Sequence, residues 1–333
     1  MEKIKVASVQ MEHRPGDKTY NLGRVEHFAR LAAGRGARAV AFPECCITSY
    51  MYLGTLSYEE LAHLAVEIPA GETVGALREI SRANDIHVLA GTLEIDRSEG
   101  GSLYNAYVAV SPEGNVVRYR KLHPFVSPYL QAGGEYVLWD LEGWKATILI
   151  CYDCNLWENW RIVGLRGAQL VFAPHQTGGF DIPCAGMGKI DPELWRNRRA
   201  EPETIRREIT GPKGLAWVRK WLPSRAYDTG TYVVFANGVG VDGEDEVRTG
   251  GSMIINPHGI ILAETSATED YLVVAELDPA ELELNLGKSH TAARRPELYG
   301  ELVQGRGAAT KEKRDEIRKK LGVEVTDKSR TAK

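Results

Sequence analysis

The chain contains 333 residues, of which 26% are charged and 43% belong to the hydrophobic set AVILMFWYC. These values are ordinary for a globular protein, so collagen-like, coiled-coil and wholly disordered structures are excluded. Lysine plus arginine (41) nearly balances aspartate plus glutamate (45), which gives a net charge of −4. Because phosphate binding needs a concentrated positive field, neither a nucleic acid nor an anionic membrane is expected as the main partner.

The sequence also predicts a cytoplasmic protein. No apolar run approaches the roughly 18–20 residues that span a bilayer. Residues 1–5 pass directly into a strand pattern, without the apolar region of a signal peptide. Five cysteines in a chain of this length are too few for a disulfide framework, which indicates a reducing compartment.

Hydrophobic patterns predict strands and helices that alternate through the first half of the chain. A strand over 4–11 is followed by a helix over 17–33, whose apolar residues recur every three to four positions. A short apolar run over 39–42 is typical of a buried strand. The other elements expected here are helices over 73–83 and 157–167 and strands over 86–93, 104–110, 115–119, 144–150 and 170–173.

Strands joined by turns dominate the second half, at 232–236, 252–255, 260–264 and 271–276. Early alternation followed by hairpins predicts a mixed sheet, or two sheets with helices outside. We expect one domain over 1–285 and a C-terminal extension over 286–333. Within the domain, residues 176–222 show little strand pattern and are expected to form a long inserted loop near a pocket or a subunit interface. From Gly305 the chain is mostly charged, and a polar helix is expected over 310–321.

Three reactive side chains, Glu44, Lys121 and Cys151, each follow directly on a strand pattern. Strand ends are where α/β enzymes gather catalytic groups, because the sheet fixes their position while the next loop admits substrate. A thiolate can act as a nucleophile, a carboxylate can take its proton and later activate water, and an ammonium can stabilise an oxyanion. Spacing alone leaves open that Cys151 is inert packing.

The residues around these strand ends resemble the three signatures of the nitrilase superfamily, the carbon–nitrogen hydrolases. The motifs occur in the family's order and read Phe42-Pro43-Glu44, Tyr119-Arg120-Lys121-Leu122-His123 and Ile150-Cys151-Tyr152-Asp153. Further matches lie in the opening strand over 5–10 and in the closing hairpin over 252–259. An ordered match of three motifs is far more specific than any one of them.

This resemblance implies an α/β fold, the four-layer α-β-β-α sandwich, assembled into homodimers or larger homo-oligomers. It implies that Glu44 is the general base, Lys121 the oxyanion-stabilising cation and Cys151 the nucleophile. The backbone N–H of Tyr152 would complete the oxyanion site. The substrate would be a small-molecule amide, N-carbamoyl compound or nitrile, hydrolysed through a thioester. The family needs no metal and no organic cofactor.

Two departures from the family pattern bear on mechanism and substrate. Many members use a second glutamate between the lysine and the cysteine; here Glu135 is the first acid after Lys121 and is the candidate for that role. Members that act on N-carbamoyl amino acids place an arginine just after the cysteine to hold the substrate carboxylate, but here Asn155 occupies that position. A substitute would have to come from the 176–222 segment: Arg196, Arg198 or Arg199.

Several residues near the motifs are candidates for lining a substrate pocket, although ordinary packing explains each of them as readily: Tyr50, Tyr129, Asn155, Trp157, His175 and Phe180. Two other functions compete. Cys151 and Cys154 form a C-x-x-C spacing that could serve a redox pair. The fold could also act as a catalytically silent scaffold or binding protein. Cys45 and Cys46 are adjacent and make a poor zinc chelate.

Overall fold

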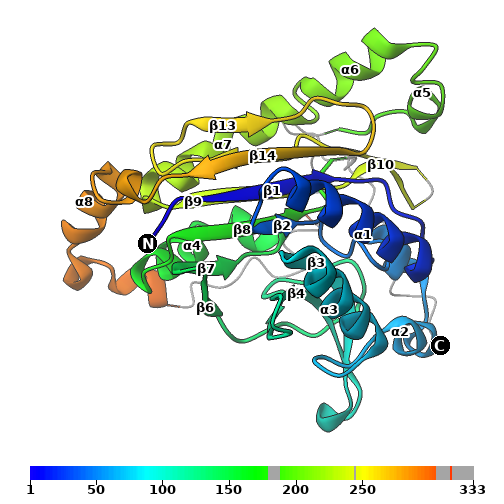
Figure 1. Ribbon diagram of the computed structural model, residues 1–333, viewed down its shortest axis with the longest axis horizontal. Coiled ribbons are helices and arrows are strands. Elements are labelled where there is room, and N and C mark those ends of the chain that lie inside the picture. The colour runs from blue at the N-terminus through cyan, green and yellow to red at the C-terminus, as the bar shows by residue number, and fades with distance from the viewer. Residues whose placement is uncertain (179–187, 244, 305–315, 317–333) are drawn as a thin grey trace.

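Two six-stranded sheets organise the computed structural model, which describes residues 1–178, 188–243, 245–304 and 316 (Figure 1). The first sheet has the order β14-β1-β2-β3-β4-β5. Its strands are β14 (Tyr271–Leu277), β1 (Ile4–Gln10), β2 (Ala39–Ala41), β3 (His87–Asp96), β4 (Ser102–Val110) and β5 (Val116–Arg120). The second sheet has the order β13-β12-β9-β8-β7-β6. Its strands are β13 (Ile261–Glu264), β12 (Met253–Ile255), β9 (Tyr232–Asn237), β8 (Leu170–His175), β7 (Trp144–Ile148) and β6 (Leu138–Leu141).

Each sheet has three parallel strands at its centre and antiparallel strands at its edges. Strands β1, β2 and β3 are parallel in the first sheet, and β7, β8 and β9 are parallel in the second. A parallel bridge between Met11 and Gly238 joins the ends of β1 and β9, so the carboxyl ends of both sets lie at the same edge. Loops that follow β2, β7 and β8 therefore emerge together, which is where α/β folds build sites.

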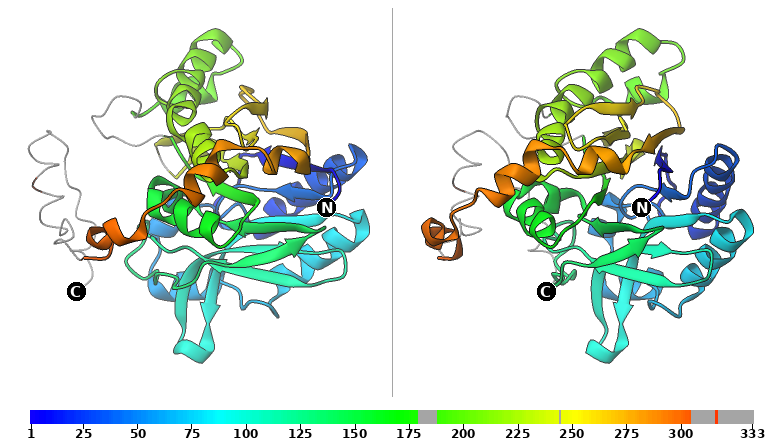
Figure 2. Two further views of the ribbon diagram at one scale, coloured as in Figure 1. Left: turned by 90° about the vertical axis from the view of Figure 1, so that its left-hand side faces the viewer. Right: turned by 60° about the vertical axis from the view of Figure 1, so that its left-hand side comes forward.

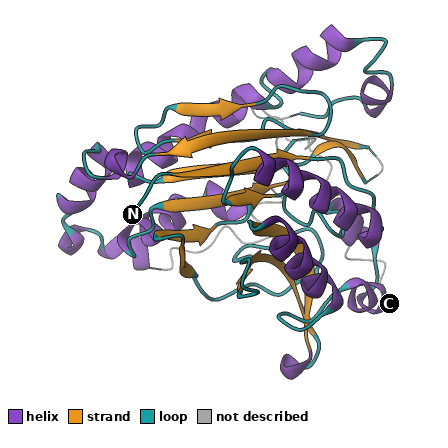
Figure 3. Ribbon diagram, in the orientation of Figure 1, coloured by secondary structure: helices purple, strands orange, loops and turns teal. Residues whose placement is uncertain are grey.

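Helices cover the outer face of each sheet, which confirms the predicted four-layer sandwich. Helices α1 (Lys18–Gly34) and α3 (Glu72–Asn84) pack on the first sheet, and α4 (Trp157–Leu165) and α7 (Leu215–Thr229) pack on the second. Figure 2 shows the sheets between these helices, and Figure 3 separates the two kinds of element by colour.

Side-chain alternation distributes the apolar residues between the layers. In β2, Ala39 and Ala41 face the space between the sheets, whereas Val40 faces α1 and α3. The core between the sheets includes Ile148 and Phe172 from the second sheet. Burying an aliphatic or aromatic side chain of this kind stabilises the fold by about 1.5–3 kcal/mol. The continuous apolar runs in the central strands arise because both of their faces are covered.

The described part of 176–222 is largely helical, so the prediction of a loop was wrong there. It contains α5 (Pro192–Arg196), α6 (Pro202–Thr210) and the first half of α7. Ile205 and Ile209 of α6 lie four residues apart and are buried against Trp195. A stripe of only two apolar residues in a polar helix is a weak sequence signal. Residues 179–187, with Phe180, lie outside the described residues.

Five further elements were not predicted from the sequence: α2 (Tyr58–Leu64), β6, β10 (Val239–Asp242), β11 (Glu246–Thr249) and α8 (Leu286–Ala292). Helix α8 starts at the expected domain boundary and packs on the end of α7, where Gly287 lies against Gly230. The boundary at residue 285 stays a prediction. The polar helix expected over 310–321 lies outside the described residues except for Glu316. No helix in the described ranges combines the length and apolar character needed to cross a bilayer.

Candidate active site

The backbone before Glu44 is held by two features of the first sheet. The Tyr107 hydroxyl accepts a hydrogen bond from Phe42 N at 3.1 Å and donates one to Leu89 O at 2.8 Å. Gly91 of β3 lets the loop pass close by, since a Cβ there would lie 2.2 Å from Cys45 N. The sheet therefore fixes where the carboxylate of Glu44 emerges.

Glu44 and Lys121 form a buried ion pair. Lys121 Nζ lies 2.6 Å from Glu44 Oε1, and both side chains are fully buried. Asn105 of β4 donates from Nδ2 to the same oxygen at 2.7 Å. The backbone carbonyl of Asn105 accepts from Lys121 N at 2.9 Å. The other carboxylate oxygen, Oε2, has no hydrogen-bond partner among the described residues. One oxygen thus orients the carboxylate, while the other is available to accept a proton.

Lys121 keeps its charge despite its position. Burial is the largest single effect and opposes the ammonium form, but the charge of Glu44, together with Tyr50, Cys151 and Asp153, outweighs it and raises the pKa of Lys121 well above its usual value. Its amine also lies 5.2 Å from the ring centre of Tyr50 and 5.0 Å from that of Phe125. A cation between aromatic faces in a dry site is a strong hydrogen-bond donor for a developing negative charge.

Cys151 lies at the point where the chain leaves β7 and turns into a short 3-10 helix, Cys151–Asn155. Its φ of 46° falls in the left-handed region, which costs a non-glycine residue roughly 1–3 kcal/mol and is a recurring feature of functional sites. The residue is 7% exposed, whereas Glu44 has no exposed surface. Burial and then the charge of Glu44 raise the pKa of the Cys151 thiol to about 12, while Lys121 lowers it. The resting nucleophile is therefore a thiol close to a carboxylate and an ammonium.

Asp153 ties the Cys151 turn to the Lys121 strand end, a role that the sequence analysis missed. Its fully buried carboxylate accepts from Leu122 N at 3.2 Å, His123 N at 2.9 Å and Ile150 N at 3.3 Å. The Tyr119 hydroxyl donates to it at 2.9 Å. The position of Asp153 inside the third motif was the only available signal, because its partners on the Lys121 side, Tyr119, Leu122 and His123, lie 30 to 34 residues away.

The structure brings one predicted pocket residue, Tyr50, to the Lys121 amine. Tyr50 is fully buried, and its hydroxyl has no partner among the described residues. Its ring lies edge-on to Phe125, which is edge-on to Tyr152. Tyr129 packs against the same apolar cluster as Tyr50, with its ring edge-on to Tyr58.

The remaining pocket candidates have contacts elsewhere. Asn155 is exposed. Trp157 is partly buried on the outer face of the second sheet, and its ring centre lies 4.8 Å from the guanidinium carbon of Arg161. His175 is buried against Phe235, with ring centres 4.6 Å apart. Burial lowers the pKa of His175 to about 3, so it is neutral at physiological pH. Their described contacts support packing roles rather than pocket roles.

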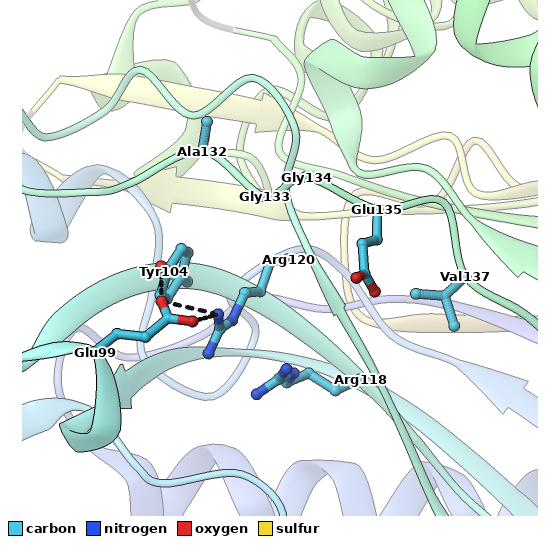
Figure 4. A pocket seen from close by; sticks show the side chains of 9 residues that line it. All are labelled: Glu99, Tyr104, Arg118, Arg120, Ala132, Gly133, Gly134, Glu135 and Val137. Atoms are coloured by element: carbon cyan, nitrogen blue, oxygen red, sulfur yellow. Dashed lines mark hydrogen bonds and ion pairs between the residues drawn. The ribbon is translucent and has the colours of Figure 1, made fainter.

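The structure does not bring Glu135 to Lys121. Glu135 is exposed and lines a separate surface pocket of about 290 Å³ beside Arg118 and Arg120 (Figure 4). Consecutive strand residues point to opposite faces of a sheet, so the Arg120 side chain lines the surface pocket whereas that of Lys121 lies beside Glu44. This geometry corrects the expectation that Glu135 is a second catalytic carboxylate.

The arginines proposed to hold a substrate carboxylate also have other described contacts. Arg196 pairs with Glu193, and Arg198 lies over Trp195, while Arg199 is exposed. The two cysteines of the C-x-x-C spacing are free thiols in different cores. Cys154 donates to Leu149 O at 3.2 Å, so a redox pair has no geometric support. Among residues 1–178, 188–243, 245–304 and 316, no group of three or more His, Cys, Asp or Glu is arranged to hold a metal ion.

Comparisons with known proteins point to one family. The model of the carbon–nitrogen hydrolase family matches residues 5–284. A nitrilase of Pyrococcus abyssi is 28% identical over 278 residues, covering 83% of this chain and 90% of that protein. An (R)-stereoselective amidase of Pseudomonas sp. is 30% identical over 279 residues, covering 83% of this chain and 85% of that protein. A solved structure of the Nesterenkonia AN1 amidase, from the nitrilase superfamily, superposes with a TM-score of 0.67 at 22% identity, covering 90% of this chain and 97% of that one.

Proposed function

Because the chain belongs to the carbon–nitrogen hydrolase family, we propose that it hydrolyses a linear amide or an N-carbamoyl group through a thioester on Cys151. The observation that carries this proposal is the buried pair of Lys121 and Glu44, 2.6 Å apart, whose charges both act on the Cys151 thiol. Buried charges are costly, and titratable groups with strongly perturbed pKa values cluster at functional sites.

In the first half-reaction, the Cys151 sulfur attacks the substrate carbonyl carbon while Oε2 of Glu44 takes the thiol proton. Lys121 and the backbone N–H of Tyr152 donate hydrogen bonds to the carbonyl oxygen as it becomes negative, each donor supplying about 3–4 kcal/mol. The carbon–nitrogen bond then breaks. Glu44 gives its proton to the departing nitrogen, which leaves as ammonia or an amine.

In the second half-reaction, water attacks the thioester and Glu44 takes a proton from it. The carbon–sulfur bond breaks and the thiol is regenerated, so the net reaction is the addition of one water across the carbon–nitrogen bond. Glu44 serves as base and acid in turn without help from Glu135. All transfers are proton transfers or acyl transfers, and they need no group beyond Glu44, Lys121, Cys151, the Tyr152 N–H and one water.

Ammonia release from a panel of amides, N-carbamoyl compounds and nitriles tests the proposal. Acid quenching during turnover should leave an acyl adduct on the Cys151 peptide, detected by mass spectrometry. A glutamate-to-glutamine mutant of the Nesterenkonia AN1 amidase carries the product of acrylamide addition at its active-site cysteine, which supports acrylamide as a further probe. A panel that gives neither ammonia nor adduct would favour the catalytically silent scaffold instead.

Nitrile hydrolysis is the second candidate, because one relative is named a nitrilase. In the panel it predicts that nitriles release ammonia faster than the matching amides. Among N-carbamoyl compounds, we expect those without a carboxylate to react best, since Arg196 and Arg198 have other described partners and Arg199 is exposed. Homodimers or larger homo-oligomers and a cytoplasmic location stay predictions, and light scattering tests the first of these.

A further inference from the structure

One polar side chain joins the Glu44 loop to the strand end beside Cys151. Gln176 follows β8 directly and is fully buried. Its Nε2 donates to the backbone carbonyl of Glu44 at 2.7 Å and lies 3.0 Å from His13 Nε2. Its backbone N–H donates toward the sulfur of Cys151. A single residue therefore contacts both the loop of the base and the nucleophile.

The orientation of the Gln176 amide is determined by its neighbours. A carbonyl can only accept, so the amide nitrogen must face Glu44 O, and its second hydrogen is directed to His13 Nε2. Burial lowers the pKa of His13, which favours the neutral ring, and the tautomer protonated at Nδ1 leaves Nε2 to accept. On the other side, the amide oxygen lies against Gly238, where a Cβ would come within 2.0 Å. The Gln176 side chain is therefore held between His13, the Glu44 loop and Gly238.

The backbone of this segment is equally fixed. Thr177 N donates to Asn237 Oδ1 at 2.8 Å, and Asn237 Nδ2 donates back to Thr177 O at 3.3 Å. These bonds attach the segment after β8 to β9, the neighbouring parallel strand. The N–H of Gln176 consequently keeps its direction toward Cys151.

We infer that Gln176 is a positioning residue that sets the distance between the Glu44 carboxylate and the Cys151 thiol, an inference that rests on the proposed function. Glu44 follows a strand of the first sheet and Cys151 a strand of the second, so the separation of the two groups depends on bonds that cross between the sheets. The hydrogen bond from the Gln176 amide to the backbone carbonyl of Glu44 is one of these bonds. Displacing a reacting group by 1 Å can cost about a hundredfold in rate.

Gln176→Met tests this inference, because methionine has a similar length and no hydrogen bond to Glu44. We expect kcat to fall about 10- to 100-fold with KM changed less than about threefold, and the melting temperature to fall because Glu44 O and His13 Nε2 each lose a buried donor. The same substitution at the exposed Gln131 is the matched control and should leave kcat unchanged. If Gln176→Met unfolds, Gly238→Ala retains the glutamine and displaces its amide, and should give the same loss.

A double-mutant cycle with Glu44→Gln separates positioning from general packing. The readout is the rate at which methyl methanethiosulfonate modifies the Cys151 peptide at pH 8, which needs no substrate. Moving the Glu44 charge away from the sulfur should speed modification in Gln176→Met, and the substitution should have no further effect when Glu44 is already Gln. An unchanged modification rate, or an equal effect in both backgrounds, would overturn the inference. Absence of amide turnover in the wild type would overturn the proposed function alone.

Discussion

The amine of Lys121 lies 2.6 Å from Oε1 of Glu44, and neither side chain has exposed surface. Desolvating two charges is expensive, and an ion pair of this kind is often no more stable than apolar residues of the same volume. The pair is therefore better explained by chemistry than by stability. It holds an ammonium and a carboxylate beside Cys151 without reorganisation during a reaction.

Replacing the nucleophile should abolish turnover without unfolding the protein. We expect Cys151→Ala to lower kcat by several orders of magnitude, as loss of a nucleophile does, with an unchanged circular dichroism spectrum. Cys154→Ala is the matched control, because Cys154 packs in a different core and should lose about 1 kcal/mol of stability but little activity. Near-wild-type ammonia release from Cys151→Ala would contradict the mechanism.

Removing the charge of the base should separate thiol reactivity from turnover. The negative charge of Glu44 is one cause of the raised pKa of Cys151, whereas Lys121 opposes it. Glu44→Gln should therefore lower that pKa and speed modification of Cys151 at pH 8, by roughly threefold for each unit of pKa because a less basic thiolate is also less nucleophilic, while amide turnover is lost. Mass spectrometry of the Cys151 peptide over pH 7–11 measures the first effect. Slower modification in the variant would show that Glu44 does not face the thiol.

The Asp153 carboxylate should matter for both stability and rate. In Asp153→Asn, one of the oxygens that now accept from Leu122, His123 and Ile150 becomes an amide nitrogen facing N–H donors. We expect a loss of about 2–4 kcal/mol in the free energy of unfolding and a lower kcat, measured by urea titration and by turnover. Asp140→Asn, at an exposed residue of β6 whose carboxylate accepts from Gly143 N, should change neither by a measurable amount.

Two glycine substitutions should have opposite effects. Gly91→Ala places a Cβ 2.2 Å from Cys45 N and 2.9 Å from the Glu44 carbonyl carbon, so the loop must shift and activity should fall with stability. Gly23→Ala lies in α1 with no atom within 4 Å of the new Cβ and should stabilise the protein by about 0.4–1 kcal/mol. Thermal melts and turnover of both variants test the contrast, and equal melting temperatures would contradict it.

His175 should contribute to acid unfolding. Its pKa is lowered to about 3 by burial, whereas a histidine in the unfolded chain titrates near 6.5. The unfolded state therefore binds the proton first as pH falls, and stability is lost between about pH 6.5 and pH 3, at up to about 1.4 kcal/mol per pH unit. Urea titrations at several pH values should show a shallower loss for His175→Phe. His258→Phe, at an exposed turn, should follow the wild-type slope.

Much of this architecture could be predicted from the sequence because it depends on local patterns. Continuous apolar runs such as 39–42 identify strands covered on both faces, and the 3.6-residue period identifies α1 and α3. The three motifs identified the family and the residues at the strand ends. The polar helices α5 and α6 were missed, since each buries only one or two side chains.

Contacts between distant segments were decided by the tertiary structure alone. Glu135 fits the sequence order of a second carboxylate, yet the alternation of β5 and the path of the following loop leave it on the surface beside Arg120. Gln176 and Asp153 carry no periodic signal, and their roles appear only where two sheets bring four strand ends together. Local sequence determines which residues leave a strand, whereas packing of the sheets determines which of them meet.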